Sequence, residues 1–515
     1  MSASLKNRST ISRGFSSRKV GIEFPCLSEE QFPPWSAAPP EAVGPLTAEP
    51  CERSKVCLEL DQPRGYSLCI AVIVLAQGAA SAGSVPNPAQ KGPYAIGHVS
   101  FVLSDQSRSG APDFQYRPIP VSVWYPVDPA TIQPSTAEAS YLWDPVYNSS
   151  QLPWSASVSS DWEPYGIDRA YQEPTPAIGP FPLVAFSPGW GAPIWAHISM
   201  ATRLASHGFV VAVMYHYGDQ WWWWEPPYDP LAVAAYNRPL DVSFVLSSLL
   251  AKNETAGDLL YQLIQPQQVA ASGWSLGGGA AMTLAAGDDR VCDTFIPWED
   301  YMKETPMWTC VASFPDPRIK AILPLDGSNQ ILHFYELARV KVPAIGVGEE
   351  WNAVLDWQAR QHAAFESHPA YRVDVFNTIH QSFGDFCEAA HVMIDTNMGG
   401  DFLSTGQWML DTFCTPDIIP SNIAHQLAYK YMIAFLKTNL VGVSGYQSML
   451  TPGWALTHEQ YVEFFVTEKR NPHSIDEDWP DLFIYFPHQP GSEQAKAEKD
   501  PKTLRPIPHS SGWRK

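Results

Sequence analysis

The sequence is poor in positive charge. Its 33 lysine and arginine residues stand against 53 aspartate and glutamate residues, which gives a formal net charge of −20 at pH 7. Such a charge repels phosphate backbones and anionic lipid surfaces, so we expect no nucleic acid partner. Charged residues make up only 17% of the chain and hydrophobic residues 45%. This balance excludes a wholly disordered protein and allows a sizeable core.

Motifs for several other chemistries are also missing. The chain has no H-E-x-x-H, no paired C-x-x-C and no P-loop, so the sequence indicates neither a metal site nor a cofactor. It contains no internal repeat. The apolar run from Leu68 to Ala76 is too short to cross a membrane, and we therefore predict no transmembrane span.

The first 82 residues differ in composition from the rest. Residues 1–65 carry proline pairs, scattered charges and no periodicity, and we interpret them as a disordered or mis-assigned extension. Residues 66–82 resemble a secretory signal, because Arg64 precedes an apolar run that ends in Ala80-Ser81-Ala82. We therefore expect a secreted, extracellular protein. The alternative is that this run is a buried strand of a cytosolic protein.

From Tyr94 onward, apolar runs alternate with helical stretches. Residues 98–103 and 119–125 alternate in polarity as an antiparallel pair of strands would. The later order of strands and helices predicts an α/β fold with a mostly parallel sheet and helices on both faces. We place this domain at residues 94–440 and predict a largely irregular extension at residues 441–515. The expected later strands are 182–187, 209–215, 269–272, 319–325, 342–347 and 371–376, and the expected helices lie near 194–206, 240–251, after 275 and at 426–436.

The strongest local pattern is Gly273-Trp274-Ser275-Leu276-Gly277, which lies between a predicted buried strand and a predicted helix. G-x-S-x-G in this context is typical of a nucleophile elbow, a tight turn that exposes the serine hydroxyl. The alternative is a glycine-rich structural turn. We predict Ser275 as a nucleophile.

A serine needs a base to accept its proton and a carboxylate to orient that base. After an elbow of this kind, the acid and then the histidine follow in the chain. Asp326 directly follows the strand-like run 319–325, at the edge where active sites of α/β sheets gather, although an aspartate there can also cap a helix. His380 follows the run 371–376. We predict Asp326 as the acid and His380 as the base, with His391 as the second choice.

A developing oxyanion needs two N–H donors. One usually comes from the residue after the nucleophile, here Leu276, and the other from a turn after an early strand. Ser187-Pro188-Gly189-Trp190-Gly191 is such a turn, and we predict Trp190 as the second donor. A plain Pro-Gly turn is the alternative.

Two segments resemble a known family. His380-Gln381-Ser382-Phe383-Gly384-Asp385-Phe386 is similar to the histidine loop of platelet-activating-factor acetylhydrolases of the plasma and type II kind, and Arg238-Pro239 with Asp241 before a helix is also similar to them. The resemblance covers about residues 94–440. It implies an α/β-hydrolase fold, no metal, and hydrolysis of short acyl esters such as the sn-2 acetyl group of phospholipids.

The same resemblance implies that Ser275, Asp326 and His380 form the triad and that Trp190 and Leu276 form the oxyanion hole. The sequence also departs from the family. Pro188 stands where the family usually has a histidine, Trp274 is unusual beside the serine, and the segment 286–316 is longer than the family's spacing. These departures leave the substrate open.

Four consecutive tryptophans, Trp221, Trp222, Trp223 and Trp224, follow one of the predicted strands. They cannot all face one core in a helix or a strand. We interpret them as a substrate rim or a transient contact with a lipid interface, or alternatively as packing against a loop or partner.

Cysteine spacing adds a prediction about the compartment. Four of the eight cysteines lie before residue 82, and an even number remains, which suits an oxidising compartment. Of three possible pairings we favour the two that each close a local loop, with four free thiols as the alternative. Asn148 and Asn253 begin N-x-S/T triplets and are candidate glycosylation sites. The favoured pairs are Cys292 with Cys310 and Cys387 with Cys414.

Together these patterns predict a secreted serine esterase that acts on short acyl esters. A general carboxylesterase or polyester hydrolase is the first alternative. A non-catalytic binding protein with a hydrolase fold is the second, and the complete triad argues against it.

Overall fold

A computed structural model describes residues 85–111, 113–143, 156–219, 229–293, 306–327, 332–349, 357–367 and 369–466. The chain divides into two units, of which the second spans residues 79–515. All described residues belong to the second unit.

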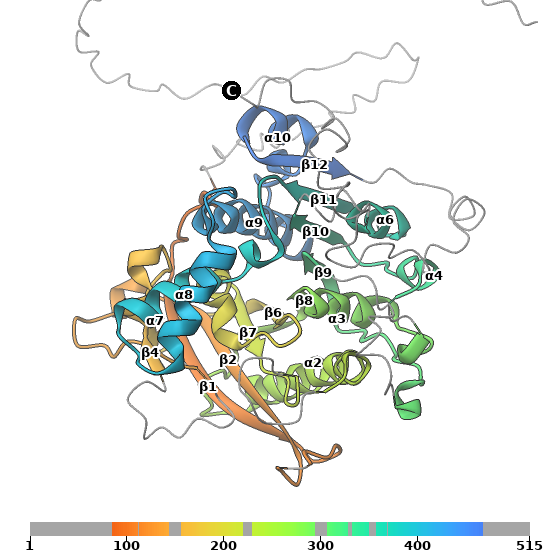
Figure 1. Ribbon diagram of the computed structural model, residues 1–515, viewed down its shortest axis with the longest axis horizontal. Helices are drawn as coiled ribbons and strands as arrows, with labels where there is room; N and C mark the ends of the chain where they lie inside the picture. The colour runs from red at the N-terminus through yellow and green to blue at the C-terminus, as the bar shows by residue number, and fades with distance from the viewer. Residues whose placement is uncertain are drawn as a thin grey trace, which may run out of the picture. The chain divides into compact units, whose positions relative to one another are not determined.

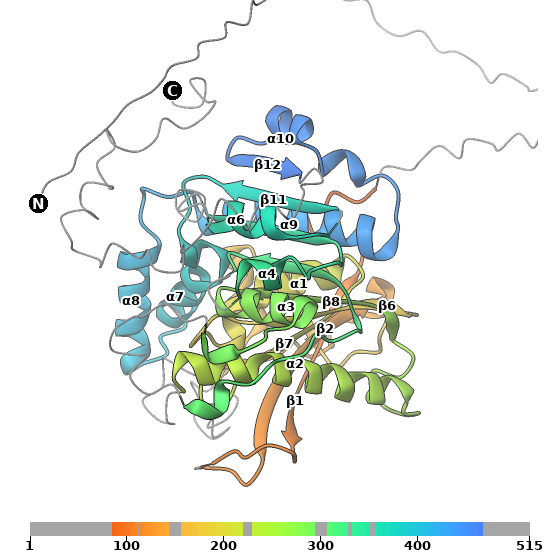
Figure 2. The ribbon, with the colours of Figure 1, turned by 90° about the vertical axis from the view of Figure 1, so that its right-hand side faces the viewer.

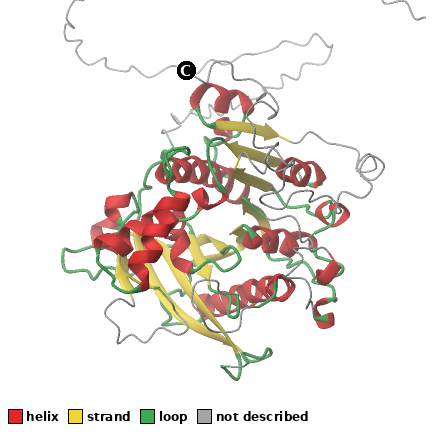
Figure 3. Ribbon diagram, viewed as in Figure 1, coloured by secondary structure: helices red, strands yellow, loops and turns green. Residues whose placement is uncertain are grey.

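The centre of the second unit is a ten-stranded sheet with the order β12-β11-β10-β9-β8-β6-β7-β2-β1-β5 (Figures 1 and 3). The run from β7 to β11 is parallel, while β1 and β2 form an antiparallel pair and β12 is antiparallel to β11. The central strands β6, β7 and β10 are buried along their whole length, as parallel strands covered on both faces must be. The sheet strands are β1 (Ala95–Asp105), β2 (Arg117–Val127), β5 (Ala170–Gln172), β6 (Phe181–Ser187), β7 (Val210–Met214), β8 (Ile264–Trp274), β9 (Ile319–Leu325), β10 (Ala344–Glu349), β11 (Ala370–Val375) and β12 (Val462–Val466), and β3 (Ser140–Leu142) pairs with β4 (Ala156–Val158) apart from them.

Helices cover both faces of the sheet, as Figures 1 and 2 show. Helices α1 and α9 pack on one face of the sheet, and α2, α3 and α6 pack on the other. Each face has its own hydrophobic core. With this strand order, the chain has the α/β-hydrolase fold, which confirms the predicted fold class. The described helices are α1 (Ile198–Ser206), α2 (Leu231–Glu254), α3 (Leu276–Ala286), α4 (Phe334–Leu337), α6 (Trp357–Ala364), α7 (Phe386–Asp395), α8 (Asp401–Phe413), α9 (Ser421–Phe435) and α10 (Pro452–His458).

The sheet extends beyond the end that the sequence analysis gave to the domain. We predicted a largely irregular chain after residue 440, whereas residues 452–466 form α10 and β12. Strand β12 pairs with β11 from Val462 to Val466, and Phe464 is buried against the rings of Tyr371 and Tyr431. A run of five residues rich in apolar side chains is too short for the sequence alone to predict a strand. Strand β12 forms because β11 offers an open edge with which it can pair.

The structure contains the two predicted disulfides. Cys292 is bonded to Cys310 and Cys387 to Cys414, with sequence separations of 18 and 27 residues. The first closes the long segment before β9, and the second joins α7 to the end of α8 just after His380. Within the described ranges, no helix has the length and hydropathy needed to cross a membrane.

Candidate active site

Ser275 lies on the turn between β8 and α3. Its φ of 54° falls in the left-handed region, which a non-glycine residue adopts at a cost and which is typical of a strained nucleophile elbow. Gly277 allows this turn, because a Cβ atom there would lie 1.8 Å from the carbonyl oxygen of Ser187. The G-x-S-x-G pattern therefore forms the predicted strand, turn and helix.

Asp326 follows β9, the strand next to β8, and its side chain is hydrogen-bonded to His380. The bond joins Asp326 Oδ2 to His380 Nδ1. The serine is tied to the same place, since the Ser275 N–H donates to the carbonyl oxygen of Leu325 at 3.1 Å. Asp326 is almost fully buried, whereas the His380 side chain is 33% exposed. The acid is thus shielded from water while the imidazole remains accessible.

Trp274 holds the histidine from the serine side. Its ring stacks on His380 with a centroid distance of 4.5 Å and an interplanar angle of 28°. Its indole N–H also donates to the His380 carbonyl oxygen at 3.0 Å. His380 begins the 3₁₀ helix η8 (His380–Phe383), in the loop after β11. The tryptophan that departs from the family pattern therefore supports both the ring and the backbone of His380.

The predicted oxyanion turn lies directly over the elbow. A Cβ atom on Gly189 would lie 2.3 Å from the Trp274 ring and 3.2 Å from the Ser275 Cβ, so only glycine fits there. Trp190 follows it, and Leu276 is the first residue of α3. The N-terminus of a helix presents free N–H groups and a partial positive charge, which suits a developing oxyanion. Leu276 thus directly follows Ser275, and Trp190 directly follows Gly189, the residue packed against the turn.

Glu349 is a second carboxyl group beside the histidine, and the sequence analysis did not identify it. Glu349 is the last residue of β10. Its backbone N–H donates to Asp326 Oδ1 at 3.2 Å, and its carboxyl group accepts from the backbone N–H of His380. Burial and the charge of Asp326 raise the pKa of Glu349 to about 9, which favours its protonated form. The signal for Glu349 was its position at the end of a buried run, which it shares with Asp326.

Two groups of described side chains bring possible metal ligands within 4.8 Å of one another: Asp326, Glu349 and His380 in one, and Asp385, Glu388 and His425 in the other. In the first, Asp326 occupies the Nδ1 atom of His380. In the second, Ser199 donates to Asp385 from both its N–H and its hydroxyl.

Other histidines and acids near these strands make contacts of their own. His391, the second choice, is on α7 and stacks on Tyr165 at 5.0 Å. His362 lies 3.0 Å from the carbonyl oxygen of Ala370. Asp316 and Asp374 are paired with nearby arginines. Asp326 and His380 are hydrogen-bonded to each other, and Asp326 follows Leu325, whose carbonyl oxygen accepts from the Ser275 N–H.

A second Ser-His-Asp chain lies behind the oxyanion turn. Ser187 Oγ is 2.8 Å from His216 Nε2, and His216 Nδ1 is 2.9 Å from Asp241 Oδ2. All three side chains are buried, and burial lowers the pKa of His216 to about 4. Arg238 also donates to Ser187 Oγ at 3.0 Å. A buried serine that already accepts from an arginine cannot meet a substrate, so this chain is structural.

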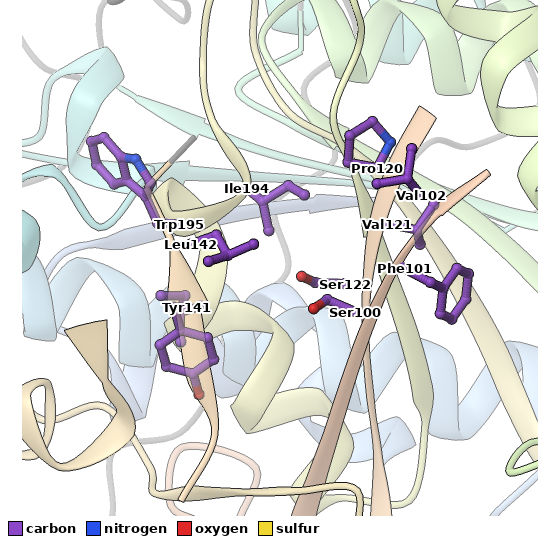
Figure 4. A pocket seen from close by; sticks show the side chains of 11 residues that line it. Ser100, Phe101, Val102, Pro120, Val121, Ser122, Tyr141, Leu142, Ile194 and Trp195 are labelled. Carbon is purple, nitrogen blue, oxygen red and sulfur yellow. The ribbon is translucent and has the colours of Figure 1, made fainter. Parts of the chain in front are cut away.

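A cavity of about 140 Å³ lies apart from the predicted triad, and Figure 4 shows the side chains that line it. It lies among β1, β2, β3 and the start of the α1 segment, with apolar walls and the hydroxyls of Ser100 and Ser122. None of the predicted triad or oxyanion residues lines it.

Three of the predicted sites have other outcomes. Trp221, Trp222, Trp223 and Trp224 lie outside the described residues, and so does Asn148. The glycosylation predicted at Asn253 is wrong, because this residue lies in α2 and is only 8% exposed. Its amide nitrogen donates to the Ile264 carbonyl oxygen at 3.1 Å, and its oxygen accepts from the Ile264 N–H. A glycan needs an accessible amide nitrogen.

Comparisons with known proteins were made by sequence and by structure. No protein-family model and no curated protein matches the chain. Among solved structures, the chain is similar to a ferulic acid esterase from Streptomyces cinnamoneus, with 19% sequence identity and a TM-score of 0.47. The match covers 73% of this chain and 97% of that one. The functional assignment therefore rests on the residues of the site.

Proposed function

We propose that this protein is a serine hydrolase of carboxylic esters. The observation that carries the proposal is the Asp326–His380 hydrogen bond beside the strained Ser275 turn, with all three residues after the carboxyl ends of parallel strands of one sheet. A buried carboxylate bonded to Nδ1 fixes the imidazole tautomer, so that Nε2 is free to accept a proton.

The proposed reaction proceeds in two halves. In the first, the Ser275 hydroxyl attacks the ester carbonyl while His380 Nε2 accepts its proton, and the tetrahedral oxyanion binds the N–H groups of Trp190 and Leu276. His380 then gives the proton to the leaving alkoxide, and an acyl-enzyme remains. In the second half, water attacks the acyl group with His380 as base, Ser275 regains its proton, and the carboxylic acid leaves.

A fluorophosphonate probe tests the chemistry directly, because it labels serines activated in this way. We expect the probe to label Ser275 and the protein to turn over p-nitrophenyl acetate. Ser275→Ala should abolish both the labelling and the turnover, and His380→Ala should reduce both at least about a thousandfold. Ser187→Ala is the matched control, since Ser187 belongs to the other Ser-His-Asp chain, and the probe should still label Ser275 there. Undiminished turnover in Ser275→Ala would refute the proposal.

We further propose short acyl esters, including sn-2 acetyl phospholipids, as substrates. The support is the resemblance of the His380–Phe386 loop to the acetylhydrolases, which in this structure forms η8 and the start of α7. A series of p-nitrophenyl esters of increasing chain length, followed by an acetylated phospholipid, tests this. A steep fall beyond short acyl groups with hydrolysis of the phospholipid supports it. Activity on a polyester film without the phospholipid would instead identify a polyester hydrolase.

A further inference from the structure

A buried arginine contacts the backbone of the oxyanion turn. Arg238 comes from α2, is only 1% exposed, and directs all three of its guanidinium nitrogens to this region. Nη2 donates to the Gly189 carbonyl oxygen at 2.8 Å, and Nη1 donates to the Pro188 carbonyl oxygen and, at 3.0 Å, to Ser187 Oγ. One rigid, planar group therefore holds three consecutive residues before Trp190.

Asp219 completes the hold from the other side of Trp190. It accepts from Arg238 Nε at 2.6 Å through one oxygen and from the Gly191 N–H at 3.0 Å through the other. The ion pair thus binds the backbone on both sides of Trp190. Because Arg238 and Asp219 are both buried and bonded to each other, neither can move without breaking this pair.

Peptide geometry links this arginine to the oxyanion. The Gly189 C=O and the Trp190 N–H belong to one planar trans peptide, so they point in opposite directions. A donor that fixes the carbonyl therefore fixes the direction of the N–H. The Ala192 N–H also donates to the Gly189 oxygen, at 3.0 Å, and the two donors together define the plane of this peptide.

We propose that Arg238 is a positioning residue that aims the Trp190 N–H at the oxyanion formed on Ser275. This inference rests on the proposed function, because it assigns Arg238 to the same site. Arg238 does not touch the substrate. Its effect should appear in the transition state, where the N–H must already have the correct direction, and not in substrate binding.

Arg117 provides a matched control within the same buried region. It is as buried as Arg238 and makes two 2.8 Å bonds to Asp241, but none of its described hydrogen bonds reaches a carbonyl of the turn. Arginine-to-lysine changes at the two positions keep the charge and remove the fork that makes paired hydrogen bonds. The loss of stability should be similar in both variants, whereas the Trp190 N–H should lose its direction only when Arg238 is replaced.

The experiment compares Arg238→Lys and Arg117→Lys on p-nitrophenyl acetate and on two inhibitors. One inhibitor is an alkyl trifluoromethyl ketone, which forms an oxyanion on the serine, and the other is the corresponding alcohol, which cannot. For Arg238→Lys we expect kcat to fall about 10- to 100-fold with KM nearly unchanged. Affinity for the ketone should fall by the same factor as kcat/KM, and affinity for the alcohol should not change. Arg117→Lys should keep kcat within about threefold.

Three results would overturn the positioning role: a kcat within about threefold of wild type in Arg238→Lys, equal losses in both variants, or a parallel loss of ketone and alcohol affinity. Failure of the proposed function is distinct, since it would appear as turnover in Ser275→Ala. If Arg238→Lys does not fold, Asp219→Asn replaces it. That change keeps an acceptor for Gly191 and weakens the hold on Arg238, so a smaller loss of kcat with the same pattern is expected, and its absence counts against the role.

Discussion

At the scale of single residues, the site contains two carboxyl groups with different jobs. Asp326 accepts a hydrogen bond from the imidazole and orients it. Glu349 is buried beside that charge, and burial together with Asp326 raises its pKa to about 9. A neutral second carboxyl group can lie next to Asp326, whereas two ionised carboxylates at this distance would repel each other.

Glu349 makes stability depend on pH in a direction opposite to that of a salt-bridged acid. Its pKa in the folded protein lies above the ordinary value of 4.5, so between these values the folded state binds more protons than the unfolded state. Stability therefore falls as pH rises from about 4.5 to 9, by at most about 1.4 kcal/mol for each pH unit. Glu349→Gln removes this dependence. We expect the melting temperature of the variant to rise relative to that of the wild type as pH increases from 5 to 9. A difference between the two melting temperatures that does not change with pH would show that Glu349 is ionised in the folded protein.

The three residues of the proposed triad could be singled out from the sequence, whereas the residues around them could not. Ser275, Asp326 and His380 each follow a buried run, and the ends of parallel strands meet at one edge of a sheet, so pattern and chain order pointed to all three. Glu349 also ends such a run, but its place beside Asp326 depends on the pairing of β10 with β9. The contact of Arg238 with Gly189 joins residues 49 apart in the chain, and no local pattern announces it.

Among the secondary-structure elements, β11, the strand that precedes His380, depends on β12 to cover its outer edge. Strand β11 would be an open edge without β12, which pairs with it along five residues. Edge strands with apolar residues are prone to aggregation when uncovered. Because His380 follows β11 by only a few residues, the integrity of this edge also bears on the site.

A comparison of two chain ends tests this element. A chain ending at residue 440 loses α10 and β12 and with them buried side chains such as Leu450, Ala455, Val462 and Phe464, each large one worth about 2 kcal/mol. We expect its melting temperature to fall by roughly 10 °C or more and its soluble yield to drop. A chain ending at residue 469 keeps both elements and should match the full-length protein. Equal stability of the two chains would show that β12 does not contribute to the fold.

Across the whole molecule, the segment that follows the proposed signal is bound to the rest of the fold. Val85 packs against the core, and the Tyr446 hydroxyl donates to the Pro86 carbonyl oxygen at 3.3 Å. Arg203 of α1 donates to the Ala89 carbonyl oxygen at 2.6 Å. The first described residues are therefore part of the fold, and a start shortly before them would leave every one of these contacts in place.

We propose that the protein is secreted and that cleavage after Ala82 leaves Gly83 as its first residue. N-terminal sequencing of protein from the culture medium of a eukaryotic host should then read Gly83, and a first residue within 1–65 would contradict the proposal.

A chain produced from Gly83 should have the same melting temperature and esterase activity as the full chain. The matched control starts at Ala95 and lacks the contacts of Val85, Pro86 and Ala89, so it should lose about 2 to 4 kcal/mol of stability through lost burial and hydrogen bonds. If the chain that starts at Gly83 were as unstable as the chain that starts at Ala95, the residues before 83 would have to contribute to the folded protein. Their removal during secretion would then leave an unstable protein, which would contradict the proposed cleavage.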